Sequence, residues 1–311
     1  GQFLPLKEEK IDSIAVIGPN ADDEMVLLGN YHGIPSKYVT PLRGIQNKIG
    51  ENIKVLYEKG SKIKGLSLRS PKNAVEVARE ADIVVLCLGL SQKLEREQFL
   101  FWWADDDRKY LHLPKAQQKL LKAVYEVNPS IVLVLLNGSP ITLNWSQEHV
   151  PAILEAWYPG QMGGQAIADV LFGEYSPAGR LPVTFPKSEK DLPPFLDYSM
   201  KNRTYRYADP EPLYPFGYGL SFTEFEYNHL KLSKDTIKVG EDLGVSVDVQ
   251  NVGGMRGEEV VQLYLKDVHA SVRVPKHELK GFQRVVLDPG ETKTVEFKIR
   301  ARQMALINYE G

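Results

Sequence analysis

The sequence is poor in cysteine, in charge of one sign and in long apolar runs. Cys87 is the one cysteine among the 311 residues, which excludes an intramolecular disulfide, and its place within an apolar run predicts a buried small side chain. Lys and Arg number 38 against 40 Asp and Glu, so the net charge of −2 gives no positive field for nucleic acid or an anionic membrane. No apolar run approaches the roughly 20 residues that cross a bilayer. We therefore expect a soluble protein with a neutral partner, and neither nucleic-acid nor membrane binding.

Several catalytic and cofactor motifs are also missing. The six histidines show no HExxH or paired-ligand spacing, no serine lies in a GxSxG elbow, and residues 18–21 (GPNA) lack both GxGxxG and the Walker lysine. The three aspartates at 105–107 lack the alternating spacing and the glycine of a calcium loop. We predict no metal and no cofactor. The chain begins without a charged and apolar signal segment, which leaves the cytoplasm open while we favour a periplasmic or secreted location.

The first part of the chain alternates short apolar runs with helical patterns. Helices are predicted where apolar residues recur at helical spacing, at 74–81, at 114–124 and around the series Ile167, Val170 and Leu171, which ends before Gly173. Strands are predicted at five short apolar runs, residues 14–17, 53–57, 83–88, 131–136 and 152–157. Strands joined by such helices imply an α/β fold with a mostly parallel sheet flanked by helices, the doubly wound class.

From about residue 232 the pattern changes to a period of two, which is typical of half-buried strands. Turn sequences at 251–254 and 288–290 separate the apolar runs at intervals typical of a sandwich. The runs lie at 243–249, 260–265, 281–282 and 294–299. This part is therefore predicted to be an all-β, immunoglobulin-like sandwich. The stretch 197–227 between the two parts is rich in Tyr, Pro and Gly, and we interpret it as an aromatic linker, some of whose rings could instead face sugar.

Residues 157–186, WYPGQMGGQAIADVLFGEYSPAGRLPVTFP, spell out a turn, a helix and a return strand at 181–185. This phrase resembles the second domain of family 3 glycoside hydrolases, the β-glucosidase and β-xylosidase group. The later NVGG and EEVVQLY phrases resemble the fibronectin type III-like domain that closes many of these enzymes. The resemblance implies an α/β sandwich domain over 1–196, the linker over 197–227, and a fibronectin type III-like sandwich over 228–311. In that family a further strand or two follows, so we expect the sandwich to be incomplete at its C-terminus.

The loop after the strand at 83–88 carries candidate catalytic carboxyl groups. Glycoside hydrolysis needs a protonated carboxyl group and a second carboxylate, and apolar neighbours favour the protonated form. Glu95 and Glu97 lie here, followed by the aromatic residues Phe99, Trp102 and Trp103, which could bind substrate. On the residues alone, we favour a solvated charge run for Glu95, Arg96 and Glu97, as most such runs are.

The family resemblance narrows this choice. Many family 3 members carry the general acid/base on this loop, in phrases such as IEAE or LEGEE followed by DR, which correspond here to Glu95, Glu97 and the pair Asp107-Arg108. We predict Glu97 as the general acid/base, with Glu95 as the alternative, and structural roles for Asp107 and Arg108. The sequence departs from the family pattern at Arg96, where glycine is frequent, at Gln98, where a third acid often stands, and at residues 102–106, where a glycine-rich spacer is common.

The resemblance also implies a missing partner. Family 3 enzymes take their nucleophilic aspartate from an N-terminal (β/α)8 barrel, and neither its SDW-like phrase nor eight βα repeats occur here. We therefore expect the C-terminal half of a retaining exo-β-glycosidase that acts on a β-linked oligosaccharide or aryl glycoside, inactive by itself, with a homodimer as a further possibility. A noncatalytic carbohydrate-binding or scaffolding module is the alternative, and a nucleotide-binding α/β domain a third.

Overall fold

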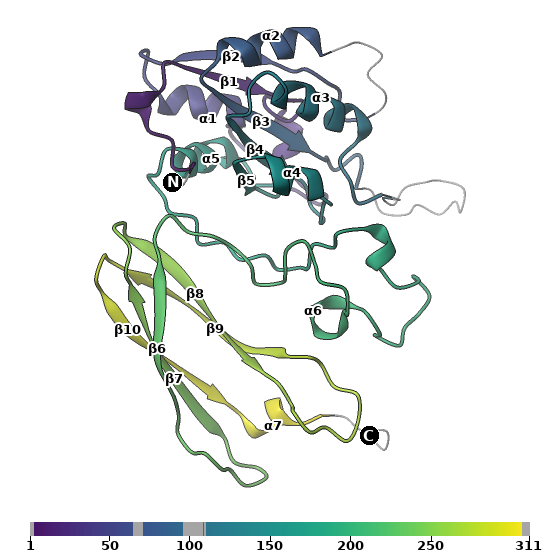
Figure 1. Cartoon of the computed structure of the whole chain (residues 1–311), viewed down its shortest axis with the longest axis vertical. Coiled ribbons are helices and arrows are strands. Elements are labelled where there is room, and N and C mark those ends of the chain that lie inside the picture. The colour runs from purple at the N-terminus through teal and green to yellow at the C-terminus, as the bar shows by residue number, and fades with distance from the viewer. Residues whose placement is uncertain (1–2, 65–70, 96–107, 109, 307–311) are drawn as a thin grey trace. The chain divides into compact units, whose positions relative to one another are not determined.

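The computed structural model describes residues 3–64, 71–95, 108 and 110–306 (Figure 1). The chain forms two compact units. The first comprises residues 1–174 with 187–189, and the second comprises 175–186 with 190–311. The division predicted at residues 196 and 227 stays a prediction.

The first unit contains a five-stranded parallel sheet in the order β2-β1-β3-β4-β5. Its strands are β1 (Ser13–Ile17), β2 (Lys54–Glu58), β3 (Ile83–Gly89), β4 (Ile131–Leu136) and β5 (Ala152–Glu155). Its helices are α1 (Pro41–Lys48), α2 (Lys72–Glu80), α3 (Lys115–Tyr125), α4 (Asn144–His149) and α5 (Gly163–Leu171). This order confirms the predicted parallel sheet flanked by helices.

The two faces of this sheet pack against different helices (Figure 1). One apolar cluster joins alternate residues of β1, β3 and β4 to the buried sides of α1 and α5, with Val16, Cys87 and Ile167 among its members. Helices α2 and α3 contact the sheet through β1, β2 and β3. Because β3 and β4 are covered on both faces, their runs are apolar at nearly every position. Cys87 is fully buried, as predicted, and this burial raises the pKa of its thiol.

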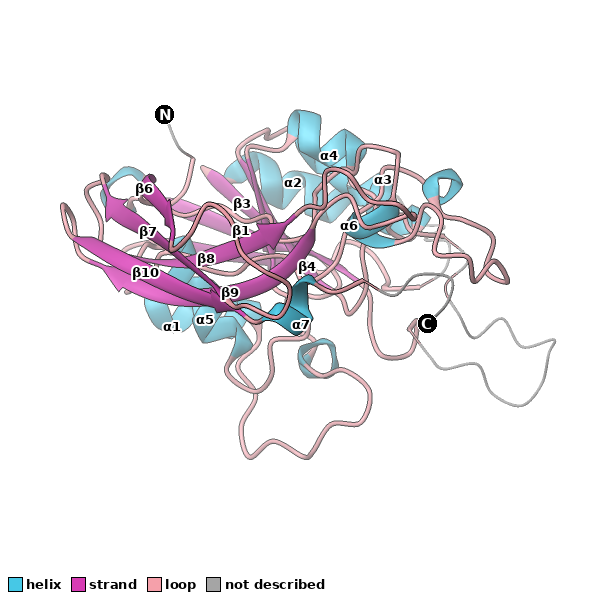
Figure 2. Cartoon of the chain, turned by 90° about the horizontal axis from the view of Figure 1, so that it is seen from below, coloured by secondary structure: helices cyan, strands magenta, loops and turns pink. Residues whose placement is uncertain are grey.

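The second unit is an antiparallel sandwich that carries its regular structure mainly in strands (Figure 2). One sheet has the order β10-β7-β6 and the other pairs β8 with β9. The strands are β6 (Phe225–Leu232), β7 (Leu243–Asn251), β8 (Gly257–Leu265), β9 (Glu278–Leu287) and β10 (Thr292–Ile299). Two short helices, α6 (Thr204–Tyr207) and α7 (Ala301–Met304), belong to the same unit. Valines at alternate positions of β7 form its core with Val261 and Leu287, which confirms the predicted period of two.

The prediction of a return strand at residues 181–185 is wrong, because the structure has no regular strand there. This segment makes backbone hydrogen bonds with residues 213–218 but forms only an isolated bridge, between Phe185 and Tyr214. Pro182, Pro186 and Pro215 lack the N–H group that a continuous ladder requires, which limits the pairing.

Rings of the aromatic stretch stack on one another within the second unit. Phe216 stacks on Tyr205 with centroids 4.3 Å apart, and Tyr214 stacks on Tyr218. Phe216 and Tyr218 line a cavity of about 340 Å³ beside β8. The Gln262 amide in this cavity donates to Gly217 O and accepts from the Tyr264 hydroxyl. Both ends of this amide are therefore already hydrogen-bonded within the protein.

Candidate active site

The carboxyl ends of the strands form one edge of the parallel sheet, the edge where open α/β sheets bind ligands. Gly89 ends β3 with a φ of +142°, and a Cβ there would lie 2.1 Å from Leu136 O of the neighbouring strand. Glycine therefore lets the chain leave β3 close against β4. The segment that follows carries Glu95 over the turn 137–140, which leaves β4.

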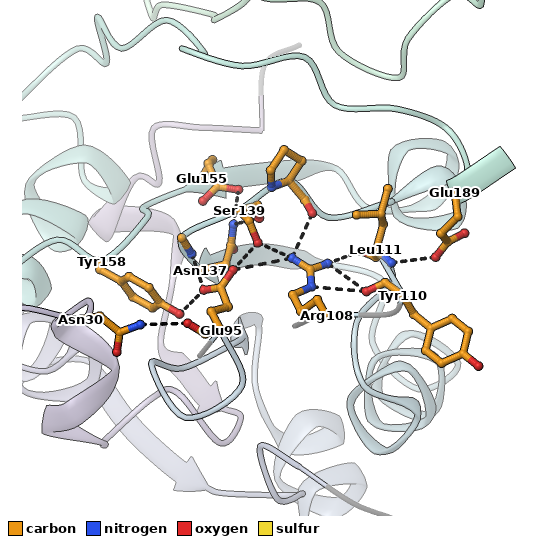
Figure 3. Close-up of polar contacts among 12 residues, drawn as sticks. Asn30, Glu95, Arg108, Tyr110, Leu111, Asn137, Ser139, Glu155, Tyr158 and Glu189 are labelled. Carbon is orange, nitrogen blue, oxygen red and sulfur yellow. Dashed lines mark hydrogen bonds and ion pairs between the residues drawn. The ribbon is translucent and has the colours of Figure 1, made fainter. Parts of the chain in front are cut away.

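Glu95 is the centre of a polar cluster at this edge (Figure 3). Its carboxylate accepts hydrogen bonds from the backbone N–H of Gly138, at 2.8 Å, and from the hydroxyl groups of Ser139 and Tyr158. Its side chain is 13% exposed. Asn30, which follows β1 in the chain, donates its side-chain amide to Glu95 O at 2.8 Å. Glu95 therefore joins segments that follow β1, β4 and β5.

Arg108 completes the cluster from the other side of Glu95 (Figure 3). Its guanidinium lies 3.6 Å from the Glu95 carboxylate and donates to Ser139 Oγ at 2.5 Å and to Pro140 O at 3.1 Å. It also donates to the carbonyl oxygens of Tyr110 and Leu111. Burial lowers the pKa of Arg108 and the charge of Glu95 raises it. The guanidinium stays charged at neutral pH, because arginine is protonated far above that range.

Tyr158 follows β5 and reaches the opposite side of the Glu95 carboxylate (Figure 3). Burial raises the pKa of the Tyr158 phenol, and the hydrogen bond to Glu95 and the charge of Glu95 raise it further. The phenol is therefore neutral and available as a hydrogen-bond donor.

Glu155 is a second carboxyl group, at the end of β5. Its oxygens accept from the backbone N–H of Trp157 at 3.1 Å and from Asn137 Nδ2 at 3.3 Å. Burial raises the pKa of Glu155 to about 8, and the charge of Glu95 acts in the same direction. The site thus holds one carboxyl group, that of Glu95, paired with Arg108, and a second, that of Glu155, whose pKa is raised by burial.

The structure describes two of the predicted site residues, Glu95 and Arg108, and brings them together. Glu97, Phe99, Trp102, Trp103 and Asp107 lie outside the described residues, as does the aspartate run at 105–107. Within the part of the chain that the structure describes, no group of three or more His, Cys, Asp or Glu residues could hold a metal ion. In the same part, no helix is long and apolar enough to cross a membrane.

Sequence reasoning missed Asn30, Asn137, Ser139, Glu155 and Tyr158. Glu155 lies within the strand predicted at 152–157, and the other four lie beyond the carboxyl end of a predicted strand, so the sheet order would have grouped them at one edge.

Comparison with known proteins identifies the family of the domain that carries this site. Residues 1–222 match the model of the glycosyl hydrolase family 3 C-terminal domain. The chain belongs to glycosyl hydrolase family 3. Residues 259–311 match the fibronectin type III-like domain, which identifies the sandwich of this family 3 chain.

Relatives of this family 3 chain are β-xylosidases and β-glucosidases. A β-xylosidase of Formosa agariphila is 40% identical over 99% of this chain, and a periplasmic β-glucosidase of Salmonella typhimurium is 38% identical over 99%. The solved β-glucosidase of Bifidobacterium adolescentis superposes on 99% of the chain with a TM-score of 0.84 at 32% identity. The chain spans 43%, 44% and 45% of these three proteins, which is less than half of each.

Proposed function

We propose that this chain is the acid/base half of a retaining exo-β-glycosidase, with Glu97 as its proton donor. The proposal combines membership of glycosyl hydrolase family 3 with a carboxyl-bearing segment at the ligand-binding edge of the sheet. In this scheme a (β/α)8 barrel, the N-terminal part expected from the family resemblance, supplies the nucleophilic aspartate.

The observation that carries the choice of Glu97 is the engagement of Glu95. Its carboxyl oxygens accept hydrogen bonds from the Gly138 N–H and from the hydroxyl groups of Ser139 and Tyr158, and the Arg108 guanidinium lies 3.6 Å away. These contacts engage both oxygens of the Glu95 carboxyl group, whereas a general acid must have an oxygen free to reach the leaving group of the substrate. Glu95 is therefore poorly suited to donate, and Glu97, two residues further along the loop, takes that role.

The proposed reaction proceeds in two steps. In the first, Glu97 gives its proton to the leaving oxygen while the barrel aspartate attacks the anomeric carbon and forms a glycosyl-enzyme. In the second, Glu97, now ionised, removes a proton from the water that hydrolyses this intermediate. Retention requires the two carboxyl groups to lie about 5–5.5 Å apart. This chain by itself therefore hydrolyses no glycoside.

The proposed substrate carries a β-linked glucose or xylose at its non-reducing end. The names of the β-xylosidase and β-glucosidase relatives support this sugar class. A periplasmic or secreted location is proposed over a cytoplasmic one, in keeping with the word periplasmic in the name of the Salmonella relative. A homodimer is a separate proposal, which light scattering of the purified protein tests.

Kinetics of Glu97→Ala test the assignment in the longer polypeptide that carries this chain together with a barrel. We expect turnover of an alkyl glycoside, whose leaving group needs a proton, to fall by about 10²–10⁴-fold. Formation of the glycosyl-enzyme from a dinitrophenyl glycoside should be nearly unchanged, because that leaving group needs no proton. Full turnover of both substrates would remove the assignment, and a longer polypeptide that binds sugar without hydrolysis would favour the noncatalytic module.

A further inference from the structure

We infer that Glu95 and Arg108 are positioning residues that clamp both ends of the acid/base segment to the turn after β4. The inference rests on the proposed function, since it assigns a role to the residues that bound 96–107. Neither residue is assigned proton transfer in this scheme. Their part is to fix where that segment enters and leaves the edge of the sheet.

The entry of the segment is fixed by Glu95. Its carboxylate is bound by the backbone of Gly138 and by Ser139 of the turn 137–140, and by Tyr158 after β5. The backbone of Glu95 is held as well, because its N–H donates to Ser91 O and its carbonyl accepts from Asn30. Both the main chain and the side chain of this residue are therefore anchored.

The exit of the segment is fixed by Arg108 on the same turn. Its guanidinium donates to Ser139 Oγ and Pro140 O, and Ser139 in turn donates to Glu95. One serine hydroxyl thus bridges the two ends of a 12-residue segment. The Leu111 N–H beyond Arg108 donates to the Glu189 carboxylate at 2.6 Å, which holds the chain that continues from the clamp.

The clamp uses both oxygens of the Glu95 side chain as hydrogen-bond acceptors. The Glu95 carboxyl group accepts three hydrogen bonds, and the positive charge of Arg108 lies 3.6 Å from it. Charge-assisted hydrogen bonds of this kind are stronger and more directional than neutral ones. An amide in place of the carboxylate keeps the shape but removes the charge and turns one acceptor into a donor that faces other donors.

The test compares Glu95→Gln with the matched control Glu148→Gln, an exposed glutamate on α4, in the longer polypeptide that contains the barrel. Small displacements of catalytic groups cost up to about 10²-fold in rate, so we expect Glu95→Gln to lower kcat by about 10–100-fold with little change in KM. The alkaline limb of the pH–rate profile, which reports the proton donor, should remain. Tyr158→Phe, which removes one donor and keeps the ring, should give the same pattern at a several-fold loss.

Three results separate the possible failures. A Glu95→Gln protein with the kinetics of Glu148→Gln would overturn the clamp while leaving the role of Glu97 intact. Loss of the alkaline limb in Glu95→Gln, with full activity in Glu97→Ala, would make Glu95 the acid and overturn both proposals. A Glu95→Gln protein that fails to fold leaves the decision to Tyr158→Phe, where unchanged kcat contradicts the clamp.

Discussion

Glu155→Gln replaces a partly buried carboxyl group with an amide of nearly the same shape. The pKa of Glu155 is raised from 4.5 to about 8 in the folded chain. Because the folded state holds this proton more tightly than the unfolded state does, the free energy of unfolding falls as the pH rises from about 4.5 to 8. The full shift corresponds to about 5 kcal/mol at about 1.4 kcal/mol per unit, and some solvent access to this strand end reduces the expected change to about 2–4 kcal/mol.

Urea denaturation of the 311-residue chain measures this change. All four tryptophans lie at 102, 103, 145 and 157, within the first unit, so tryptophan fluorescence follows the unfolding of the unit that contains Glu155. The difference in unfolding free energy between Glu155→Gln and the parent chain should move in favour of the variant by about 2–4 kcal/mol between pH 4.5 and 8.5. The control Glu148→Gln, on exposed α4, should show a difference that is flat with pH. A flat difference for Glu155→Gln would mean that Glu155 is ionised in the folded chain, which refutes the reasoning.

Two further predictions test the packing of each unit. Gly89→Ala should destabilise the first unit by more than about 3 kcal/mol in the same fluorescence assay, because its Cβ would meet the backbone of Leu136. The control Gly33→Ala, with open space around the added Cβ, should change the free energy of unfolding by no more than about 0.5 kcal/mol. Equal effects of the two substitutions would contradict the close approach of β3 and β4. Arg180→Ala should destabilise the second unit by about 3–5 kcal/mol, since it leaves Glu259 buried without its partner at 2.7 Å. The exposed pair of Arg284 with Glu258 is the control, and Arg284→Ala should cost about 1 kcal/mol or less. Hydrogen exchange of the β8 amides measures the loss of stability in both variants. Similar exchange in the two variants would argue against a structural role for the buried pair.

The sheet could be predicted from the sequence because its central strands, β1, β3 and β4, are buried along nearly their whole length. Runs such as 131–136 are apolar at every position, and Gly89 and Asn137 mark their ends. Strand β6 was missed, since most of its residues are exposed and its sequence has no buried period of two. Residues 181–185 were predicted as a strand because they are mostly apolar, but the prolines in and beside this segment prevent a continuous hydrogen-bonded ladder.

The candidate site was predicted only in part, because its contacts join residues far apart in the chain. Glu95 meets Gly138 across 43 positions and Tyr158 across 63, separations that no local pattern reveals. The family phrase placed Glu95 and Arg108 on one loop, while their engagement with Ser139 required the sheet order. The raised pKa of Glu155 depends on burial by the surrounding fold, and a lone glutamate after an apolar run does not indicate it.

Azide trapping tests the central claim, that Glu97 is the proton donor, most directly. In a polypeptide that joins this chain to a (β/α)8 barrel, Glu97→Ala with an activated aryl glycoside and sodium azide should regain turnover and release a glycosyl azide of retained β configuration, since azide attacks the glycosyl-enzyme without a general base. Glu95→Ala should show no such rescue. A glycosyl azide formed by Glu95→Ala and absent from Glu97→Ala would contradict the account.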